Sequence, residues 1–202
     1  MNYLAIDTSG DLLVIVNANG KKTVRNLTGC QTKHSLTLMP YIEEAMEELG
    51  VSLNNLDFFA VVVGPGSFTG IRIGVATVKA LCLATGKKAL TVTSFDLLAY
   101  SNNAPEKCVC LVDANHGNYY FTAYENKSVV YPPAFMTKEE ICSKFADFTP
   151  VSLKEEPIDG AIIVDAVSGM ENAIEAKCDN LIDYNAVQPL YVKRSQAEEE
   201  SC

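Results

Sequence analysis

The stretch around residue 60 constrains the fold more than any other part of the chain. An apolar run at 58–63 is ended by Gly64-Pro65-Gly66 and is followed by a second apolar stretch at 71–83. A valine-rich run closed by Gly-Pro-Gly predicts a buried strand and a tight loop. The second stretch has only three polar side chains, so it predicts a long helix that is apolar almost all the way round. We expect one face of this helix on its own sheet and the other against a second layer or a partner.

The N-terminal half has the pattern of a three-stranded meander followed by alternating helices and strands. Asn19-Gly20 stands between two strand-like runs and predicts a tight hairpin turn. Between residues 36 and 49 apolar positions recur at helical spacing, four glutamates fill the other face, and Gly50 closes the segment. The elements expected here are strands at 3–6, 12–16 and 21–26, a helix at 36–49, the central strand and its helix, a strand at 89–93 and a helix at 94–101.

The second half repeats the plan of the first. Asp113 ends an apolar run as Asp7 does, and a turn lysine, Lys127 or Lys21, follows each Asp by 14 residues, so both pairs are offset by 106. The elements expected here are strands at 110–113, 119–124 and 128–131, a helix at 137–148, and a strand at 161–164 with a helix at 169–177 as a shorter copy of the central strand and its helix. We interpret the chain as a duplicated βββαβα unit. The polar stretch at 102–105 predicts a boundary between domains 1–103 and 104–202.

Charge and composition exclude several classes of function. The net charge of -9, with an acidic run at Glu198-Glu199-Glu200, argues against a chain that grips nucleic acid alone, because phosphates are bound by clustered Lys and Arg. With no apolar stretch of about 18 residues and no leader pattern, we expect a cytoplasmic protein without a membrane segment. The seven cysteines form no C-x-x-C pair and the chain has two histidines, which predicts no zinc site. Cys108 and Cys110 fit small buried hydrophobes better than a redox pair.

The loop Gly64-Pro65-Gly66-Ser67 admits two interpretations. Exposed amides at a helix start hold anions, so Gly64, Gly66 and Ser67 are candidate phosphate-binding residues. The loop lacks the Gly-Lys-Ser/Thr of a Walker motif, and its third glycine comes one residue late for the dinucleotide fingerprint G-x-G-x-x-G. The alternative is that the glycines shape a sharp turn and permit close packing.

A second candidate site follows the first strand, at Asp7-Thr8-Ser9-Gly10. An actin-like or sugar-kinase-like ATPase places an acid for a metal ion there, with small polar residues round a phosphate. Asp7, Thr8 and Ser9 are therefore candidate nucleotide-binding residues. The same string is the signature of aspartic proteases, which need a paired copy, and Asp113-Ala114-Asn115-His116 does not supply Thr-Gly. The protease interpretation is accordingly disfavoured.

Longer motifs span essentially the whole chain. They are Asp7-Thr8-Ser9, His34-Ser35-Leu36-Thr37-Leu38-Met39-Pro40, Val63-Gly64-Pro65-Gly66-Ser67-Phe68-Thr69-Gly70-Ile71-Arg72-Ile73-Gly74, Asp113-Ala114-Asn115-His116-Gly117-Asn118-Tyr119-Tyr120 and Pro189-Leu190-Tyr191-Val192-Lys193-Arg194-Ser195-Gln196-Ala197-Glu198. Together they resemble the bacterial TsaB (YeaZ) family, and the glycine-rich motif is the most specific of them. The resemblance implies an α/β, actin-like/Hsp70-like (ASKHA) ATPase fold of two RNase H-like βββαβα halves, the second reduced.

The same resemblance implies a role in making N6-threonylcarbamoyladenosine (t6A) beside the anticodon of tRNAs. In that family the protein is a noncatalytic partner that dimerises with a catalytic TsaD paralogue, joined by the ATPase TsaE. TsaD-like proteins carry a metal-binding His-x-x-x-His after the glycine-rich helix, whereas this chain has Ser94 and Leu98 at those positions. The turn Asn115-His116-Gly117-Asn118 departs from the basic and acidic residues usual in the family.

We therefore expect a partner-binding subunit without catalytic residues or a metal of its own. It should form a homodimer when alone, meet tRNA only through the complex, and contact ATP or ADP at most at a complex interface. The alternatives are an active ASKHA-type ATPase or kinase, a glycoprotease-like peptidase, and a free-standing homodimeric scaffold. The expected interface combines the surplus face of the glycine-rich helix with the amphipathic helix beside it. Its residues are Met39, Ile42, Met46, Gly70, Ile71, Gly74, Val75, Val78 and Cys82.

Overall fold

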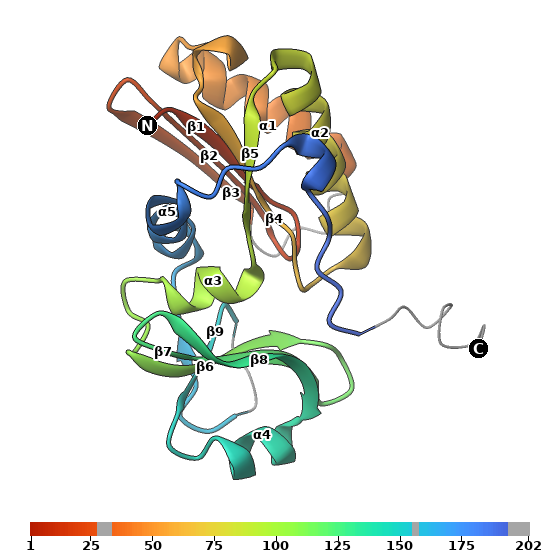
Figure 1. Ribbon diagram of the computed structural model, residues 1–202, viewed down its shortest axis with the longest axis vertical. Helices are drawn as coiled ribbons and strands as arrows, with labels where there is room; N and C mark the ends of the chain where they lie inside the picture. Colours follow the sequence, from red (N-terminus) through yellow and green to blue (C-terminus); the bar gives the residue numbers. More distant parts are fainter. Residues whose placement is uncertain (28–33, 155–157, 194–202) are drawn as a thin grey trace, which may run out of the picture.

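The computed structural model describes residues 1–27, 34–154 and 158–193. These residues form two lobes, each built on a five-stranded mixed sheet (Figure 1). Some sequence features discussed above lie outside the described residues. They are Cys30, Cys202, the acidic run at 198–200 and the end of the C-terminal motif from Arg194 onward.

The first sheet has the strand order β3-β2-β1-β4-β5. It is antiparallel across β3, β2 and β1 and parallel across β1, β4 and β5. Every residue of β1 and β4 is buried, which explains their continuous apolar runs. Asn19 and Gly20 have φ angles of 55° and 72°, as a two-residue hairpin turn requires. The strands are β1 (Tyr3–Asp7), β2 (Leu12–Ala18), β3 (Lys21–Leu27), β4 (Phe58–Val62) and β5 (Lys88–Val92).

Two long helices, α1 (His34–Leu49) and α2 (Phe68–Thr85), cover one face of this sheet and share its core; the short helix η1 (Leu53–Asn55) precedes β4. α2 begins after Ser67, whose hydroxyl accepts a hydrogen bond from the Gly70 amide, and ends at Gly86 in a left-handed conformation. By length and composition α2 could span a membrane, contrary to the expectation that the chain has no such stretch. Its seven buried residues nevertheless pack on the sheet, as in the core helix of a globular domain.

The face of α2 that was predicted as an interface lies against the chain's own sheet. The predicted interface residues that the structure buries are Ile42, Met46, Gly70, Ile71, Gly74, Val75, Val78 and Cys82. Met39 is the one member of the predicted set that is exposed, and the structure describes all nine. The prediction is corrected accordingly, because side chains covered within the chain cannot contact a partner. On these two helices a partner can therefore reach only the outward faces.

The second sheet has the strand order β10-β9-β6-β7-β8, in which β6, β7, β8 and β9 take the places of β1, β2, β3 and β4. β6 is antiparallel to β7 and parallel to β9, as β1 is to β2 and β4. The predicted duplication is confirmed. The second copy is reduced, because the described residues between β9 and β10 contain no helix equivalent to α2. Its elements are β6 (Lys107–Asp113), β7 (Asn118–Glu125), β8 (Ser128–Thr137), α4 (Lys138–Lys144), β9 (Thr149–Ser152) and β10 (Ile162–Ile163).

The counterpart of the central strand was predicted in the wrong segment. β9 lies beside β6 as β4 lies beside β1, whereas the predicted strand at 161–164 gives only the short edge strand β10. Thr149-Pro150-Val151-Ser152 lacks the long apolar run that marks β4. Pairing with β6 and complete burial of Val151 in the core shared with α3 hold this segment in the sheet.

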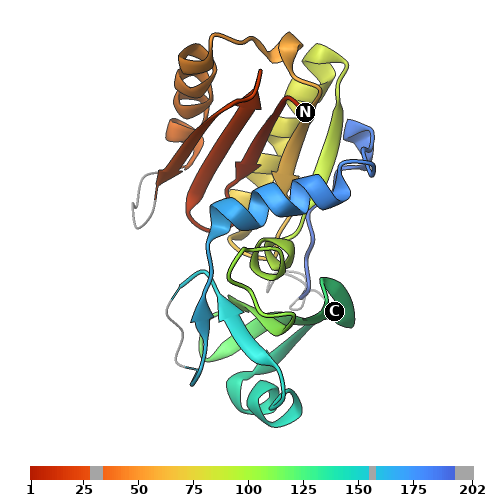
Figure 2. The same cartoon turned by 90° about the vertical axis from the view of Figure 1, so that its left-hand side faces the viewer.

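The chain returns to the first lobe after β10. α5 (Ala166–Lys177) lies on the face of the first sheet opposite α2 and contacts α3 (Ser94–Ala99); Figure 2 shows α5 in front of the sheet and α2 behind it. Met170 and Ile174 are fully buried there, and burying each contributes about 1.5–3 kcal/mol. Ile182 then exchanges two backbone hydrogen bonds with Ala89, and η2 (Tyr184–Ala186) contacts α2. The division of folding units at residue 103 stays a prediction.

Candidate functional site

The glycine-rich loop packs directly on the turn between β1 and β2. A Cβ atom on Gly70 would overlap the carbonyl oxygen of Thr8, and one on Gly66 would overlap the carbonyl oxygen of Ser9. A Cβ atom on Gly64 would come within 2.7 Å of the Ile71 side chain. Gly66 and Gly70 are thus needed for close approach of backbone to backbone and Gly64 for packing against Ile71, which favours the packing interpretation of the loop.

Hydrogen bonds within the chain join the loop to the turn. The Ser67 amide donates to the Ser9 carbonyl at 2.6 Å, and the Thr8 hydroxyl donates to the Gly70 carbonyl at 2.7 Å. The Ser9 amide donates to Oδ1 of the buried Asp7 at 2.7 Å. The structure therefore brings the predicted nucleotide-binding residues together, but it engages their donors inside the protein.

The two aspartates of the duplicated plan make the same local contact. Asp113 Oδ1 accepts the Asn115 amide at 2.8 Å, as Asp7 Oδ1 accepts the Ser9 amide. The turn after Asp113 continues through His116, and both Asn115 and His116 have positive φ angles. Each carboxylate thus caps the turn at the end of its own strand, so both aspartates have a structural function.

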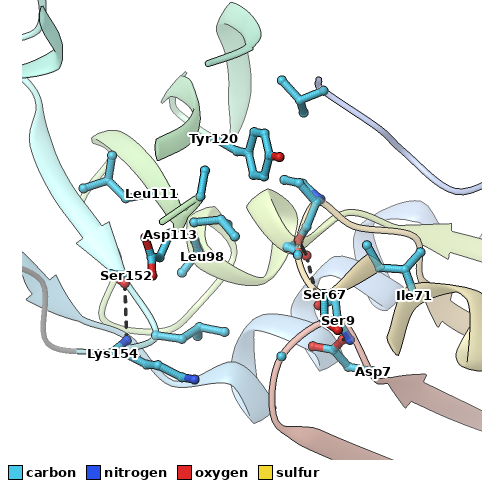
Figure 3. A pocket seen from close by; sticks show the side chains of 18 of the residues that line it. Asp7, Ser9, Ser67, Ile71, Leu98, Leu111, Asp113, Tyr120, Ser152 and Lys154 are labelled. Carbon is cyan, nitrogen blue, oxygen red and sulfur yellow. Dashed lines mark hydrogen bonds between the residues drawn. The ribbon is translucent and has the colours of Figure 1, made fainter. Parts of the chain in front are cut away.

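A cavity of about 1160 Å³ lies between the two lobes, beside the loop and the turn (Figure 3). Asp7 and Ser67 line its first-lobe wall, and Asp113 and Lys154 line its second-lobe wall. An ion pair crosses between the walls, with Lys154 Nζ 3.9 Å from Asp11 Oδ1. The volume is slightly above the range of about 300–1,000 Å³ that is typical of small-molecule sites. The duplicated aspartates line opposite walls of this one cavity.

Ser94 and Leu98, the positions where the resemblance implied histidines in a catalytic paralogue, line this cavity. The Ser94 hydroxyl donates to the Pro65 carbonyl at 2.6 Å and lies 3.2 Å from the Ser9 hydroxyl. Leu98 is buried in the core between α3 and the second sheet. In the described part of the chain, no group of three His, Cys, Asp or Glu side chains is placed to hold a metal ion.

A buried polar cluster joins α3 to the second sheet and to α5. Asp96 accepts the Tyr124 hydroxyl at 3.0 Å, and Lys177 Nζ lies 2.6 Å from its other oxygen. Burial, together with the Asp96 charge, raises the pKa of Tyr124 well above its ordinary value. Beside them the Sγ atoms of Cys108 and Cys110 are 4.0 Å apart, and burial raises the pKa of Cys110. The cluster is built into the core, which favours the interpretation of both cysteines as buried hydrophobes.

An exposed apolar face lies on the outer side of α1 and α2, and of its residues sequence reasoning found Met39 alone. We call it the docking face, and its residues are Leu36, Met39, Ile73, Ala76, Ala80 and Leu83. Leu36 is 71% exposed and Leu83 is 65% exposed, whereas Ile73 is half-buried. The sequence contained a signal that could have predicted the exposure of Leu36 and Met39. The buried stripe of α1 runs through Leu38 and Ile42, so Leu36 and Met39 lie off it.

Comparison with known proteins places these observations in a family. The family model described as TsaD, tRNA N6-adenosine threonylcarbamoyltransferase, matches residues 28–134, which is more than half of the chain. The tRNA threonylcarbamoyladenosine biosynthesis protein TsaB of Escherichia coli is 27% identical over 128 residues, covering 62% of this chain and 55% of the relative. TsaB of Bacillus subtilis is 29% identical over 130 residues, covering 63% of this chain and 57% of that relative. These matches span somewhat more than half the length of the curated relatives.

The likeness extends to solved structures. YeaZ from Pseudomonas aeruginosa superposes with a TM-score of 0.78 at 21% sequence identity, covering 94% of this chain and 99% of that one. A second Pseudomonas aeruginosa structure, described as an uncharacterized protein with similarity to peptidase YEAZ, gives a TM-score of 0.79 at 22% identity. At this level of identity the likeness shows the fold, the two-lobed α/β arrangement with a duplicated sheet. The chain belongs to the TsaB (YeaZ) family, which shares the TsaD family model.

Proposed function

We propose that this protein is a noncatalytic subunit of the machinery that makes N6-threonylcarbamoyladenosine in tRNA. In this role it dimerises with a catalytic TsaD-like paralogue and supports threonylcarbamoyl transfer to the adenosine next to the anticodon. The names of its relatives, as tRNA threonylcarbamoyladenosine biosynthesis proteins, support the pathway. The internal hydrogen bonds of Thr8, Ser9 and Ser67 support a site that has a structural function.

The docking face is the observation that carries the dimerisation proposal. It combines the large exposed side chains Leu36 and Leu83 with Ala76 and Ala80, which lie one turn apart and let a facing helix approach closely. Exposed apolar side chains grouped on two neighbouring helices mark a protein interaction site. Both α1 and α2 lie entirely within the region matched by the TsaD family model. A TsaD-like paralogue therefore has an equivalent helix pair, and the two pairs can pack as a four-helix layer about a pseudo-twofold axis.

The proposal has further parts. A chain without its paralogue covers the docking face by forming a homodimer, because large apolar patches favour association in water. A TsaE-like ATPase joins the heterodimer, ATP or ADP binds at the complex interface, and the tRNA is held mainly by the partner subunits. The protein works in the cytoplasm, where its tRNA substrate is found.

Sedimentation of the chain mixed with its TsaD-like paralogue tests the proposal. Leu83→Glu buries an unpaired carboxylate at the interface, which costs about 2 kcal/mol or more and weakens association by about 30-fold. Its thermal melt should equal that of the wild type, because Leu83 contributes little to the core. Val130→Glu is the matched control, since Val130 is half exposed on the far lobe.

The outcomes separate the docking face from the core. Loss of association by Leu83→Glu, with normal association by Val130→Glu, supports the proposal. Val78→Glu, at a fully buried position of the same helix, should instead collapse the melt. Wild-type association by a folded Leu83→Glu variant, or no association of the wild type with the paralogue, would overturn the proposed function.

A further inference from the structure

The exposed aromatic side chains of this protein gather in one place. The described residues include all eight Phe and nine Tyr of the chain, and of these only Phe68, Phe135 and Tyr191 are exposed, by 40%, 37% and 42%. All three line the interlobe cavity. They come from three separate segments, namely the start of α2, the strand β8 and residues 187–193, which we call the C-terminal segment. Single exposed aromatic residues are ordinary, but convergence of all of them from three segments marks a binding surface.

Two cations lie against these rings. The guanidinium carbon of Arg72 is 3.8 Å from the centre of the Phe68 ring, and Arg72 Nε donates to the Tyr191 hydroxyl at 3.1 Å. The rings of Phe68 and Tyr191 have centroids 5.0 Å apart. Across the cavity, Lys193 Nζ lies 4.9 Å from the centre of the Phe135 ring. We call these five residues the aromatic rim.

The rim is held in place from both lobes. The Leu190 amide donates to the Val63 carbonyl at 2.7 Å, and Lys79 Nζ donates to the carbonyl of the buried Val187 at 3.2 Å. In Figure 1 this C-terminal segment runs from η2 beside α2 toward the level where the lobes meet. On the second lobe the Phe135 ring packs on Tyr120 at a centroid distance of 5.8 Å. Rings fixed in this way lose little conformational entropy when a ligand stacks on them.

We infer that the aromatic rim binds unpaired nucleotides of an RNA. Bases stack on Phe, Tyr and Arg planes, while Lys and Arg meet the phosphates, and this combination is typical of single-stranded nucleic-acid sites. An apolar peptide would not engage the charges of the two cations, and an acidic peptide would not stack on the three rings, whereas unpaired nucleotides can do both.

The inference rests on the proposed function, which makes a tRNA the substrate of the complex. Arg72 is one helical turn, about 6 Å, from Ala76 of the docking face. The rim is therefore within reach of an RNA held by a partner on that face. Because the chain is strongly acidic as a whole, the rim adds to RNA affinity in the complex and binds RNA weakly alone.

The test uses the chain assembled with its TsaD-like paralogue, and the probe is a fluorescent, unmodified tRNA transcript followed by anisotropy. The first variant is Tyr191→Ser with Lys193→Gln, and the second is Phe135→Ser on the other lobe. Loss of a stacking platform should weaken tRNA binding by about fivefold or more, and loss of Lys193 should lower the slope of log affinity against log salt by about one. The matched control is Val130→Ser with Lys127→Gln, which removes an exposed apolar side chain and a cation elsewhere and should bind like the wild type.

A second readout uses the absence of tryptophan from the chain. Tyr191→Trp introduces a single indole at the rim, and base stacking should quench its fluorescence when a single-stranded RNA oligonucleotide is titrated into the isolated chain. The same substitution at Tyr184, which lies in η2 and outside the cavity lining, is the control and should stay unquenched.

The outcomes distinguish this inference from the proposed function. If the complex forms and both rim variants bind tRNA like the wild type, the rim does not bind RNA and the inference is overturned, while the subunit role stands. If the rim variants lose the paralogue instead of the tRNA, the rim is a protein contact and the inference is equally overturned. If the wild-type chain never binds the paralogue, the proposed function fails, and quenching of Tyr191→Trp then decides the inference by itself.

Discussion

The backbone of Gly70 lies against the carbonyl oxygen of Thr8 with no room for a side chain between them. This contact joins the start of α2 to the turn after β1. Gly70→Ala would force the two segments apart and should destabilise the protein by about 3 kcal/mol or more, as overpacking of a tight core does. Gly10→Ala is the control, because a Cβ atom there meets nothing within 4 Å, and its effect should stay within about 0.5 kcal/mol. Urea denaturation measures both, and equal stability of the two variants would contradict the close-packing interpretation.

The ion pair between Lys177 and Asp96 predicts a second stability effect. Asp96 is buried, so removing the Lys177 charge leaves a carboxylate with only its hydrogen bonds from Thr93 and Tyr124. Lys177→Met should cost roughly 2 kcal/mol, below the full cost of breaking a buried pair because Lys177 is partly exposed. Lys127→Met removes a cation near the same Tyr100 ring without touching Asp96 and should be nearly neutral. If denaturation curves show the same loss of stability for both variants, the ion pair between Lys177 and Asp96 does not stabilise the protein.

Acid should weaken the start of α5. Burial opposes ionisation of Asp165, but hydrogen bonds from the amides of Val167 and Ser168 outweigh it and hold the pKa of Asp165 below its ordinary value. A lowered pKa in the folded state stabilises the protein above the unfolded value of about 3.9, and this stability is lost as pH falls through the folded pKa.

Asp165→Ala should therefore cost about 1 kcal/mol near neutral pH, and its difference from the wild type should shrink progressively below about pH 4. Denaturation of both proteins across this range measures the effect. A difference that is constant with pH would show that the ionised carboxylate does not cap the helix.

The elements that the sequence predicted correctly are those with strong local signals. The turn at Asn19-Gly20 and the buried run of β4 follow from turn chemistry and apolar patterning, and the duplication follows from Asp7 and Asp113. β9 escaped prediction because the segment is short, is interrupted by Pro150 and has Val151 as its one aliphatic side chain besides the proline, and its place is set by pairing with β6. The same applies to residues 182–193, which have no periodicity and are held by backbone contacts to Val63 and Ala89.

The face of α2 that packs on the sheet could not be predicted from the sequence. A helix that is apolar nearly all the way round gives no preferred face, so the stripe through Ile71 and Val78 looked as available to a partner as the opposite one. Tertiary contacts fix which face of α2 is buried, because Gly70 and Gly74 must face Thr8 for the loop to pack on the turn. The rim residues Phe68 and Tyr191 are 123 positions apart in the chain and could be associated only in the folded protein.

We expect the isolated chain to bind no ATP at micromolar concentration and to hydrolyse none. The amides that would face a phosphate are those of Ser67, just before α2, and of Ser9, in the turn after β1, and they donate instead to the Ser9 carbonyl and the Asp7 carboxylate. Freeing both donors would break two hydrogen bonds, at about 0.5–1.5 kcal/mol each or more where a charge is involved, and would separate the glycine loop from the turn. Calorimetric titration of ATP with Mg²⁺ into the lone chain measures the affinity, and the same titration into the assembled complex separates interface binding from binding in the cavity. A dissociation constant of about 10 μM or below for the lone chain, which corresponds to roughly 7 kcal/mol of binding free energy, would defeat the structural interpretation of the loop.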